Sequence, residues 1–112
     1  MPDFLHPGLA AGRWFELSLC EQLGNVGSEV GRAVQWEQKG NPIQREHALE
    51  RALDLLDLTL ADPRWQGRRY ELCRAREVVV DTFYGQRVYG DTPAGLEKYF
   101  YWYALAARQK IT

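Results

Sequence analysis

Apolar residues recur along the chain at alternating spacings of three and four, the pattern of one face of an α-helix. This pattern predicts four helices, over residues 14–39, 43–61, 64–84 and 93–109. In the second segment an acidic face lies opposite the apolar one, so that helix is expected to be amphipathic. In the third segment Val78-Val79-Val80 also has the composition of a short strand. We expect a helix there, because no other segment offers a pairing partner.

Three of the predicted helices begin at a capping residue followed directly by proline. The side-chain oxygen of Asn, Asp or Thr accepts a hydrogen bond from a free amide of the first turn, where proline loses no needed donor. The pairs are Asn41-Pro42, Asp62-Pro63 and Thr92-Pro93. Connections between the first three helices are very short, so consecutive helices are expected to run antiparallel. The sequence therefore predicts an all-α fold, an antiparallel up-down-up-down four-helix bundle over residues 13–112, preceded by an N-terminal arm over residues 1–12.

The composition is that of one globular domain. Of the 112 residues, 46% are apolar and 26% are charged, which suits an ordinary hydrophobic core. No apolar run approaches the roughly 18 residues of a bilayer-spanning helix, and the first residues lack the basic start of a secretory signal. We therefore expect a cytoplasmic protein with no membrane partner, in which Cys20 and Cys73 are reduced thiols.

Three glycines share one side of the first predicted helix, at Gly24, Gly27 and Gly31. Each interior glycine costs about 1 kcal/mol of helix propensity relative to alanine, so a compensating contact is expected. A row of glycines lets another backbone approach closely. The partner is either a bulky helix of the same chain, such as the aromatic fourth helix, or another subunit or a ligand.

The fourth predicted helix is apolar on too many sides for a monomeric bundle. When its main stripe faces the core, Tyr101, Trp102 and Leu105 project away from it. Apolar residues also lie off the main stripes of the first two helices, at Trp14, Trp36, Leu55 and Leu58. Clustered Trp and Tyr side chains are typical of protein interfaces. We expect a homo-oligomer in which the fourth helix contributes to the contact, unless the arm or the long loop before that helix covers these residues.

Charge is balanced overall, with 14 Lys and Arg against 15 Asp and Glu, but it is unevenly distributed. Residues 64–76 hold five arginines and one glutamate, whereas residues 46–62 hold five acids and one arginine. The basic segment could bind phosphates and unpaired bases through Arg64, Arg68, Tyr70 and Arg74. We favour the alternative that neighbouring helices of opposite sign neutralise each other, within a subunit or between subunits, because two of these arginines, Arg69 and Arg76, are expected to point inward.

Arg69 and Arg76 fall inside the apolar arc of the third predicted helix. A buried guanidinium needs a partner, because leaving it unpaired costs several kcal/mol. Glu16 and Glu37 are candidate partners for a buried ion pair. The alternative is an anion site for a bound phosphate or carboxylate, which would make the protein a small-molecule binder or an enzyme working around Arg76.

No catalytic residue, metal site or cofactor is predicted. A carboxylate-bridged di-metal bundle needs Glu-x-x-His pairs on two helices, and the nearest match is one reversed pair, His47 and Glu50, on a polar face. No phosphate-binding glycine loop is present. These patterns favour a non-enzymatic, homo-oligomeric assembly or accessory protein.

The stretch Asn25-Val26-Gly27-Ser28-Glu29, followed by Gly31-Arg32, is similar to an Asn-Ile-Ala-Glu-Gly stretch of known bundle proteins. With its four short-looped helices, the chain resembles the small bacterial proteins encoded within 23S rRNA intervening sequences and the related accessory variability determinants of diversity-generating retroelements. The resemblance implies a ring-like homo-oligomer with nucleic acid or a nucleic-acid enzyme as partner.

Overall fold

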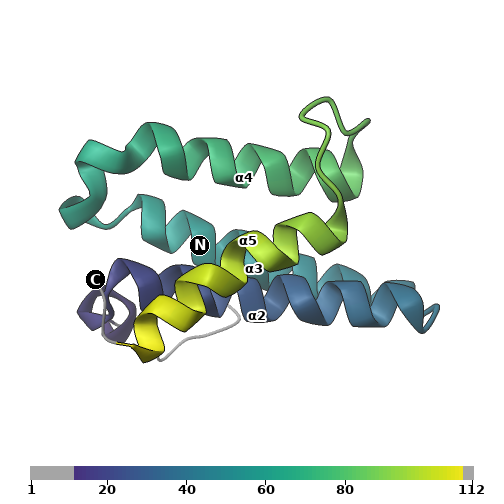
Figure 1. Cartoon of the computed structure of the whole chain (residues 1–112), viewed down its shortest axis with the longest axis horizontal. Coiled ribbons are helices and arrows are strands. Elements are labelled where there is room, and N and C mark those ends of the chain that lie inside the picture. The colour runs from purple at the N-terminus through teal and green to yellow at the C-terminus, as the bar shows by residue number, and fades with distance from the viewer. Residues whose placement is uncertain (1–11, 110–112) are drawn as a thin grey trace.

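The computed structural model describes residues 12–109. Within this range the chain is all-α, as predicted, with four helices, two short 3-10 segments and no strand (Figure 1). The elements are η1 (Arg13–Glu16), α2 (Leu19–Gln38), α3 (Pro42–Leu60), η2 (Pro63–Arg68), α4 (Arg69–Tyr84) and α5 (Pro93–Arg108). The N-terminal arm predicted for residues 1–12 lies outside the described residues except for Gly12. Among the described helices, none combines the length and the hydropathy needed to cross a bilayer.

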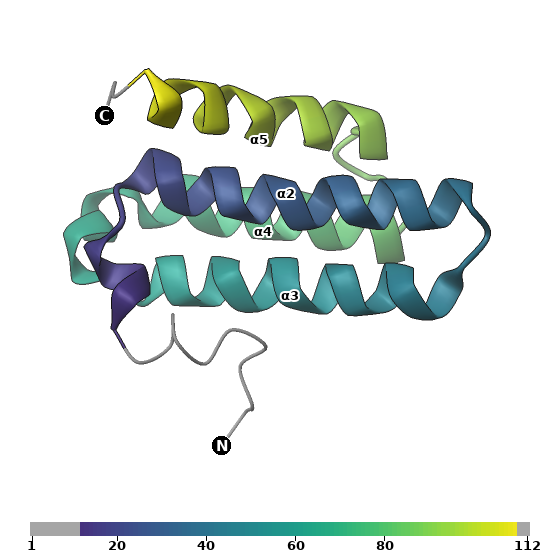
Figure 2. The ribbon, with the colours of Figure 1, turned by 90° about the horizontal axis from the view of Figure 1, so that it is seen from below.

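Helix α2 lies between α3 and α5 and packs along both of them (Figure 2). Helix α4 lies over this layer and approaches α3 and α5 much more sparsely. The core between the layers is formed by apolar side chains from every helix, the largest of which are fully buried: Leu23, Val26, Val30, Leu49, Leu56, Leu72, Val79, Leu96 and Phe100. Because α4 contacts α5 at few positions, the two helices are loosely packed on this side of the bundle.

The first helix starts later than its hydrophobic pattern predicts. The chain makes the 3-10 segment η1, becomes extended at Leu17, and enters α2 at Leu19. A capping box sets this start: Ser18 Oγ accepts from the Glu21 amide at 3.1 Å, and Glu21 Oε1 accepts from the Ser18 amide at 2.9 Å. The prediction of a helix from residue 14 was therefore wrong, because apolar side chains in a short turn matched the helical period.

Two of the three proline-marked starts, those of α3 and α5, are found where the sequence predicts them. Asn41 Oδ1 accepts from the Gln44 amide at 3.1 Å, and Thr92 Oγ1 accepts from the Gly95 amide at 3.0 Å. Asp62 Oδ1 likewise accepts from the Arg64 amide. The helix that begins there is interrupted, because residues 63–68 form η2 and α4 begins only at Arg69. The valine run is helical, as expected.

One end of the bundle is closed by buried polar side chains. The Trp14 indole donates to Thr59 Oγ1 at 3.2 Å, and Gln22 Nε2 donates to the Trp14 carbonyl at 2.8 Å and to Asp62 Oδ2 at 3.1 Å. Gln22 Oε1 accepts from the Trp65 indole at 2.9 Å. Gln22 and Thr59 are fully buried, and these bonds satisfy their polar groups. The network joins η1 and η2 to the layer of α2 and α3.

Several apolar residues that lie off the main stripes are covered by this packing. Trp14, Leu55 and Leu58 are buried, whereas Trp36 is half-buried. The η1 and η2 segments shield apolar side chains that would be exposed in a bundle of four straight helices. The surplus of apolar surface is therefore smaller than the pattern predicts, and what remains exposed lies chiefly on α4, α5 and the loop between them.

Candidate interaction surface around α5

The glycine row of α2 packs against α5 of the same chain, which is the first of the two predicted alternatives. The nearest α5 atoms to a Cβ built on Gly24, Gly27 and Gly31 are, in that order, Ala104 Cα at 3.0 Å, Phe100 Cβ at 2.5 Å and Glu97 Oε2 at 2.9 Å. The partner residue numbers fall as the glycine numbers rise, so α2 and α5 are antiparallel. The glycines thus allow the two helices to nest closely.

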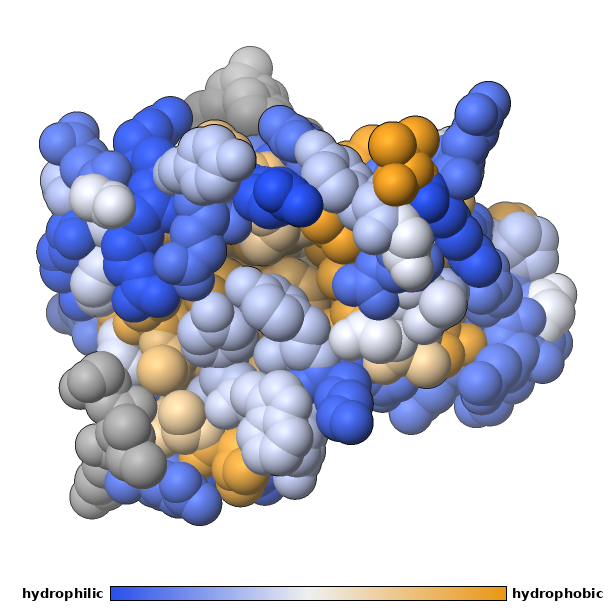
Figure 3. All heavy atoms as spheres, turned by 45° about the horizontal axis from the view of Figure 1, so that its top comes forward, coloured by the Kyte–Doolittle hydropathy of each residue, from blue (hydrophilic) through white to orange (hydrophobic). Residues whose placement is uncertain are grey.

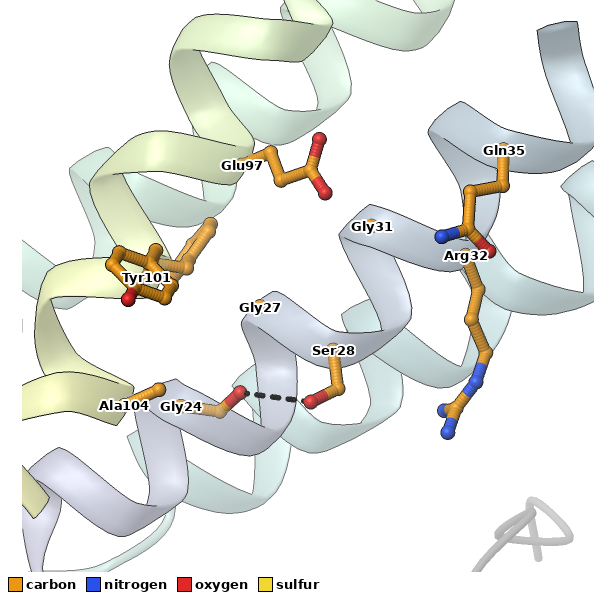
Figure 4. A pocket seen from close by; sticks show the side chains of 10 residues that line it. Gly24, Gly27, Ser28, Gly31, Arg32, Gln35, Glu97, Tyr101 and Ala104 are labelled. Carbon is orange, nitrogen blue, oxygen red and sulfur yellow. Dashed lines mark hydrogen bonds between the residues drawn. The ribbon is translucent and has the colours of Figure 1, made fainter. Parts of the chain in front are cut away.

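A groove runs along the outer side of this α2–α5 contact, and we call it the seam groove. It consists of two adjoining pockets of about 350 and 480 Å³ that share Gly24, Ser28, Tyr101 and Ala104. One end is lined by Arg32, Gln35 and Glu97, and the other by Glu21, Ala107 and Arg108. Figure 4 shows Tyr101 and Glu97 projecting from α5 over the glycine side of α2. The groove therefore has a floor of small residues and charged ends.

A second hollow lies between α4 and α5, and we call it the α4–α5 hollow. Its volume is about 310 Å³, and its lining is mainly apolar, with Ala75, Val78, Leu96 and Tyr99. Tyr70, Glu71, Arg74 and Asp91 complete the lining. Figure 3 shows apolar atoms at the bottom of a depression on this face, surrounded by more hydrophilic residues. Sparse packing of α4 leaves this surface open.

Aromatic side chains cover the outer side of α5 between the two hollows. Trp102 is 57% exposed, Tyr101 50% and Tyr99 37%, while Leu105 is half-buried. The Tyr101 and Trp102 ring centroids are 6.1 Å apart. The loop before α5, one of the covers considered from the sequence, leaves these rings exposed; the arm lies outside the described residues. Tyr101 and Trp102 therefore project from the fourth helix as predicted, whereas Leu105 is partly covered.

Tyr103 ties α5 to α4 beside these exposed rings. Its hydroxyl donates to Glu71 Oε1 at 3.2 Å and lies 3.3 Å from the Tyr99 hydroxyl. Burial, followed by the bonds to Tyr99 and Glu71, raises the pKa of Tyr103, so the ring stays a neutral donor. This contact is one of the few that hold α4 near α5.

The arginines proposed to bind nucleic acid have partners within the chain. Arg64 pairs with Asp62 at 2.7 Å, and Arg68 pairs with Glu71 at 3.0 Å. Arg74 lies 4.6 Å from the centre of the Tyr89 ring. Tyr70, by contrast, is 83% exposed. The segment does form one exposed region, but much of its charge is already compensated.

Arg69 and Arg76 are not buried, which corrects the prediction made from the apolar arc. Arg69 is exposed at the start of α4 and donates to the Leu60 carbonyl at 3.0 Å. Arg76 Nε lies 2.7 Å from Asp57 Oδ1, where the Arg76 side chain is partly exposed and the Asp57 side chain is exposed to solvent. The expected ion pair thus joins α4 to the acidic face of α3, rather than to Glu16 or Glu37. The sparse packing of α4 on α3 leaves this pair open to water.

A buried charge lies on α2, where sequence analysis did not place one. Glu29 is 2% exposed, and its carboxylate pairs with Arg32 on the same helix and with Arg51 on α3. The signal was present: Glu29 falls next to Val26 and Val30 in the apolar stripe, and Arg51 is the only arginine of the acidic segment. The Glu29–Arg51 pair therefore joins α2 to α3 at a buried position.

The described residues contain no group of three or more His, Cys, Asp and Glu side chains that could hold a metal ion. His47 is exposed on α3, and Cys20 and Cys73 are free, half-buried thiols. The arrangement can offer apolar, aromatic and paired-charge contacts to another molecule. Comparison with protein families, with curated proteins and with solved structures finds no match to this chain.

Proposed function

We propose that this protein is a non-enzymatic assembly or accessory module that associates with further copies of itself, and that α5 forms part of the contact surface. The observation that carries the proposal is the outer side of α5, where Trp102 and Tyr101 are at least half-exposed next to each other. Trp and Tyr are the residues that most often dominate interface energies, because they bury a large area at small conformational cost.

The hollows on either side of α5 support the same proposal. An exposed aromatic ridge gains most from burial when grooves of the partner receive it. The seam groove and the α4–α5 hollow together offer such space on this chain. A near-neutral chain, with a formal charge of −1, also opposes self-association less than a strongly charged one would.

The proposal includes an antiparallel up-down-up-down order of the helices and a cytoplasmic location. The short connections after α2 and α3 and the antiparallel α2–α5 contact support this order. The free thiols Cys20 and Cys73 fit a reducing compartment.

Light scattering over a micromolar concentration series tests self-association. We expect a mass above that of one 12.9 kDa chain, rising with concentration towards a fixed multiple. A monodisperse monomer throughout the series would reject the proposal.

A second candidate function, nucleic-acid binding, is favoured by one observation: Tyr70 is 83% exposed beside the exposed side chains of Arg68 and Arg74. Such a ring can stack on an unpaired base while arginines meet phosphates. Fluorescence anisotropy with single-stranded RNA at low salt tests this. Binding that weakens in Arg74→Ala but not in Arg13→Ala would support it, and absence of binding would remove it.

A further inference from the structure

The charges that line the seam groove alternate in sign around its four corners. On α2, Glu21 precedes Arg32 by about three helical turns, or about 17 Å. On α5, Glu97 precedes Arg108 by the same spacing. Because α2 and α5 are antiparallel, Arg32 lies with Glu97 at one end of the groove, and Glu21 lies with Arg108 at the other. Each end therefore carries one acid and one base, with the order reversed between the ends.

This pattern is complementary to a second copy of itself. A two-fold axis that lies in the interface and runs along the groove places α5 of a second copy over α2, and α2 of the second copy over α5. This rotation does not change the position of a residue along the groove, so each end of the groove meets the same end of the groove in the second copy. Arg32, which shares the buried Glu29 carboxylate with Arg51 in its own chain, then faces Glu97 of the second copy. Glu21 faces Arg108 of the second copy. Four charge pairs of opposite sign form across the dimer.

The charges would also pair around a two-fold axis that runs across the groove. The shape of the groove favours the axis along it. Tyr101 forms a half-exposed ridge at the middle of α5, level with Gly27 and Ser28 of α2. Rotation about the axis along the groove places Tyr101 of each copy over the small residues Gly24 and Ser28 of the other. Rotation about an axis across the groove would instead place the two Tyr101 ridges on each other.

The carboxylate of Glu97 is available for such a contact. It lies over Gly31, and it makes no hydrogen bond or ion pair with any residue in the described range. Arg108, the base at the other end of α5, is exposed and lies 5.9 Å from the Tyr101 ring. A cationic side chain from a second copy could therefore form an ion pair with the Glu97 carboxylate.

We infer that the seam groove is the contact surface of a symmetric dimer, in which a second copy of this chain lays its α5 along α2 and pairs its charges in the order given above. The inference rests on the proposed self-association and goes beyond it by naming the surface, the symmetry and the pairs. Charge pairs at an interface contribute more to the choice and register of the partner than to total affinity.

A charge-swap experiment on full-length protein, read by sedimentation equilibrium, tests the inference. Arg108→Glu replaces two attractive Glu21–Arg108 contacts per dimer with two repulsive ones, so we expect the dimer Kd to rise at least tenfold. Glu21→Arg alone should weaken the dimer similarly. The double variant Glu21→Arg with Arg108→Glu should return the Kd to within about threefold of the unmodified protein. Glu21→Arg also removes the carboxylate that accepts from the Ser18 amide at the start of α2, so circular dichroism melts establish that each variant is folded before its Kd is compared.

The matched control is Arg69→Glu, which makes the same charge change on an exposed arginine at the start of α4, outside the groove. It should leave the Kd unchanged. A dimer that is insensitive to Arg108→Glu would overturn the inference while leaving self-association intact. Rescue of Arg108→Glu by Glu97→Arg instead of Glu21→Arg would overturn the inferred arrangement. A monomeric unmodified protein would remove the proposed function itself.

Discussion

Gly27 of α2 lies so close to Phe100 of α5 that a Cβ on residue 27 would come within 2.5 Å of the Phe100 Cβ. Real Cβ atoms do not approach this closely, so the helices can nest here only while residue 27 is glycine. The three glycines of α2 make different contacts, and Gly27 makes the tightest one.

Gly27→Ala should therefore destabilise the fold. Alanine gains about 1 kcal/mol of helix propensity, but the clash with Phe100 forces the two helices apart at the cost of core packing. We expect a net loss of about 1–3 kcal/mol in the free energy of unfolding, measured by urea denaturation at fixed protein concentration. Gly67→Ala is the control, because a Cβ there meets no atom within 4 Å. Equal stability of the two variants would mean that the close contact does not restrain the bundle.

The Glu29–Arg51 pair links α2 to α3 from a buried position. Removing Arg51 leaves the buried Glu29 carboxylate paired with Arg32 alone, so Arg51→Met should cost about 2 kcal/mol of stability. The double variant Glu29→Leu with Arg51→Met replaces the pair by apolar contacts and should recover most of that loss. A double-mutant cycle from chemical denaturation measures the coupling. Additive losses would show that the two side chains act independently.

Asp62 makes stability depend on pH. Its hydrogen bonds to Arg64 lower its pKa below the ordinary 3.8, although burial opposes this shift. The unfolded chain therefore takes up the proton first, and the stabilisation is present above about pH 4 and is lost as pH falls through the folded pKa. Asp62→Asn, which keeps an oxygen to cap η2, should lose less stability between neutral and acidic pH than the unmodified protein. Thermal melts across this range would contradict the account if both proteins lost stability in parallel.

Trp102→Ala should weaken self-association without unfolding the chain, because the indole is 57% exposed. A tryptophan that becomes buried at an interface contributes about 2 kcal/mol or more, which corresponds to roughly a thirtyfold rise in Kd. Ile43→Ala is the matched control: its side chain is 68% exposed at the start of α3. Analytical ultracentrifugation of both variants provides the measurement. Equal weakening by the two would place the contact elsewhere than on α5.

Local signals predicted the helices well where backbone chemistry decides their ends. Proline after Asn41, Asp62 and Thr92 marks three starts, since a cap and a preset φ act within a few residues. The Ser18 cap was missed because Trp14 continued the helical spacing of apolar residues. The interruption over residues 63–68 was missed for the same reason, although Asp62 was identified as the cap.

The candidate site was less predictable, because it depends on which faces meet in three dimensions. Periodicity placed Trp102 outside the core, as found, since that requires only the turn of one helix. It could not show that Arg76 would reach Asp57, because the reach depends on how α4 lies on α3. The alternation of charges around the seam groove likewise needs the register of α2 against α5, which the Gly27–Phe100 contact fixes.

Native mass spectrometry of the purified, unmodified protein at micromolar concentration tests the central claim most directly, because it counts chains and detects any retained ligand together. The account predicts a dominant species with an even number of chains and no bound small molecule. A spectrum containing only single chains at every concentration would contradict it.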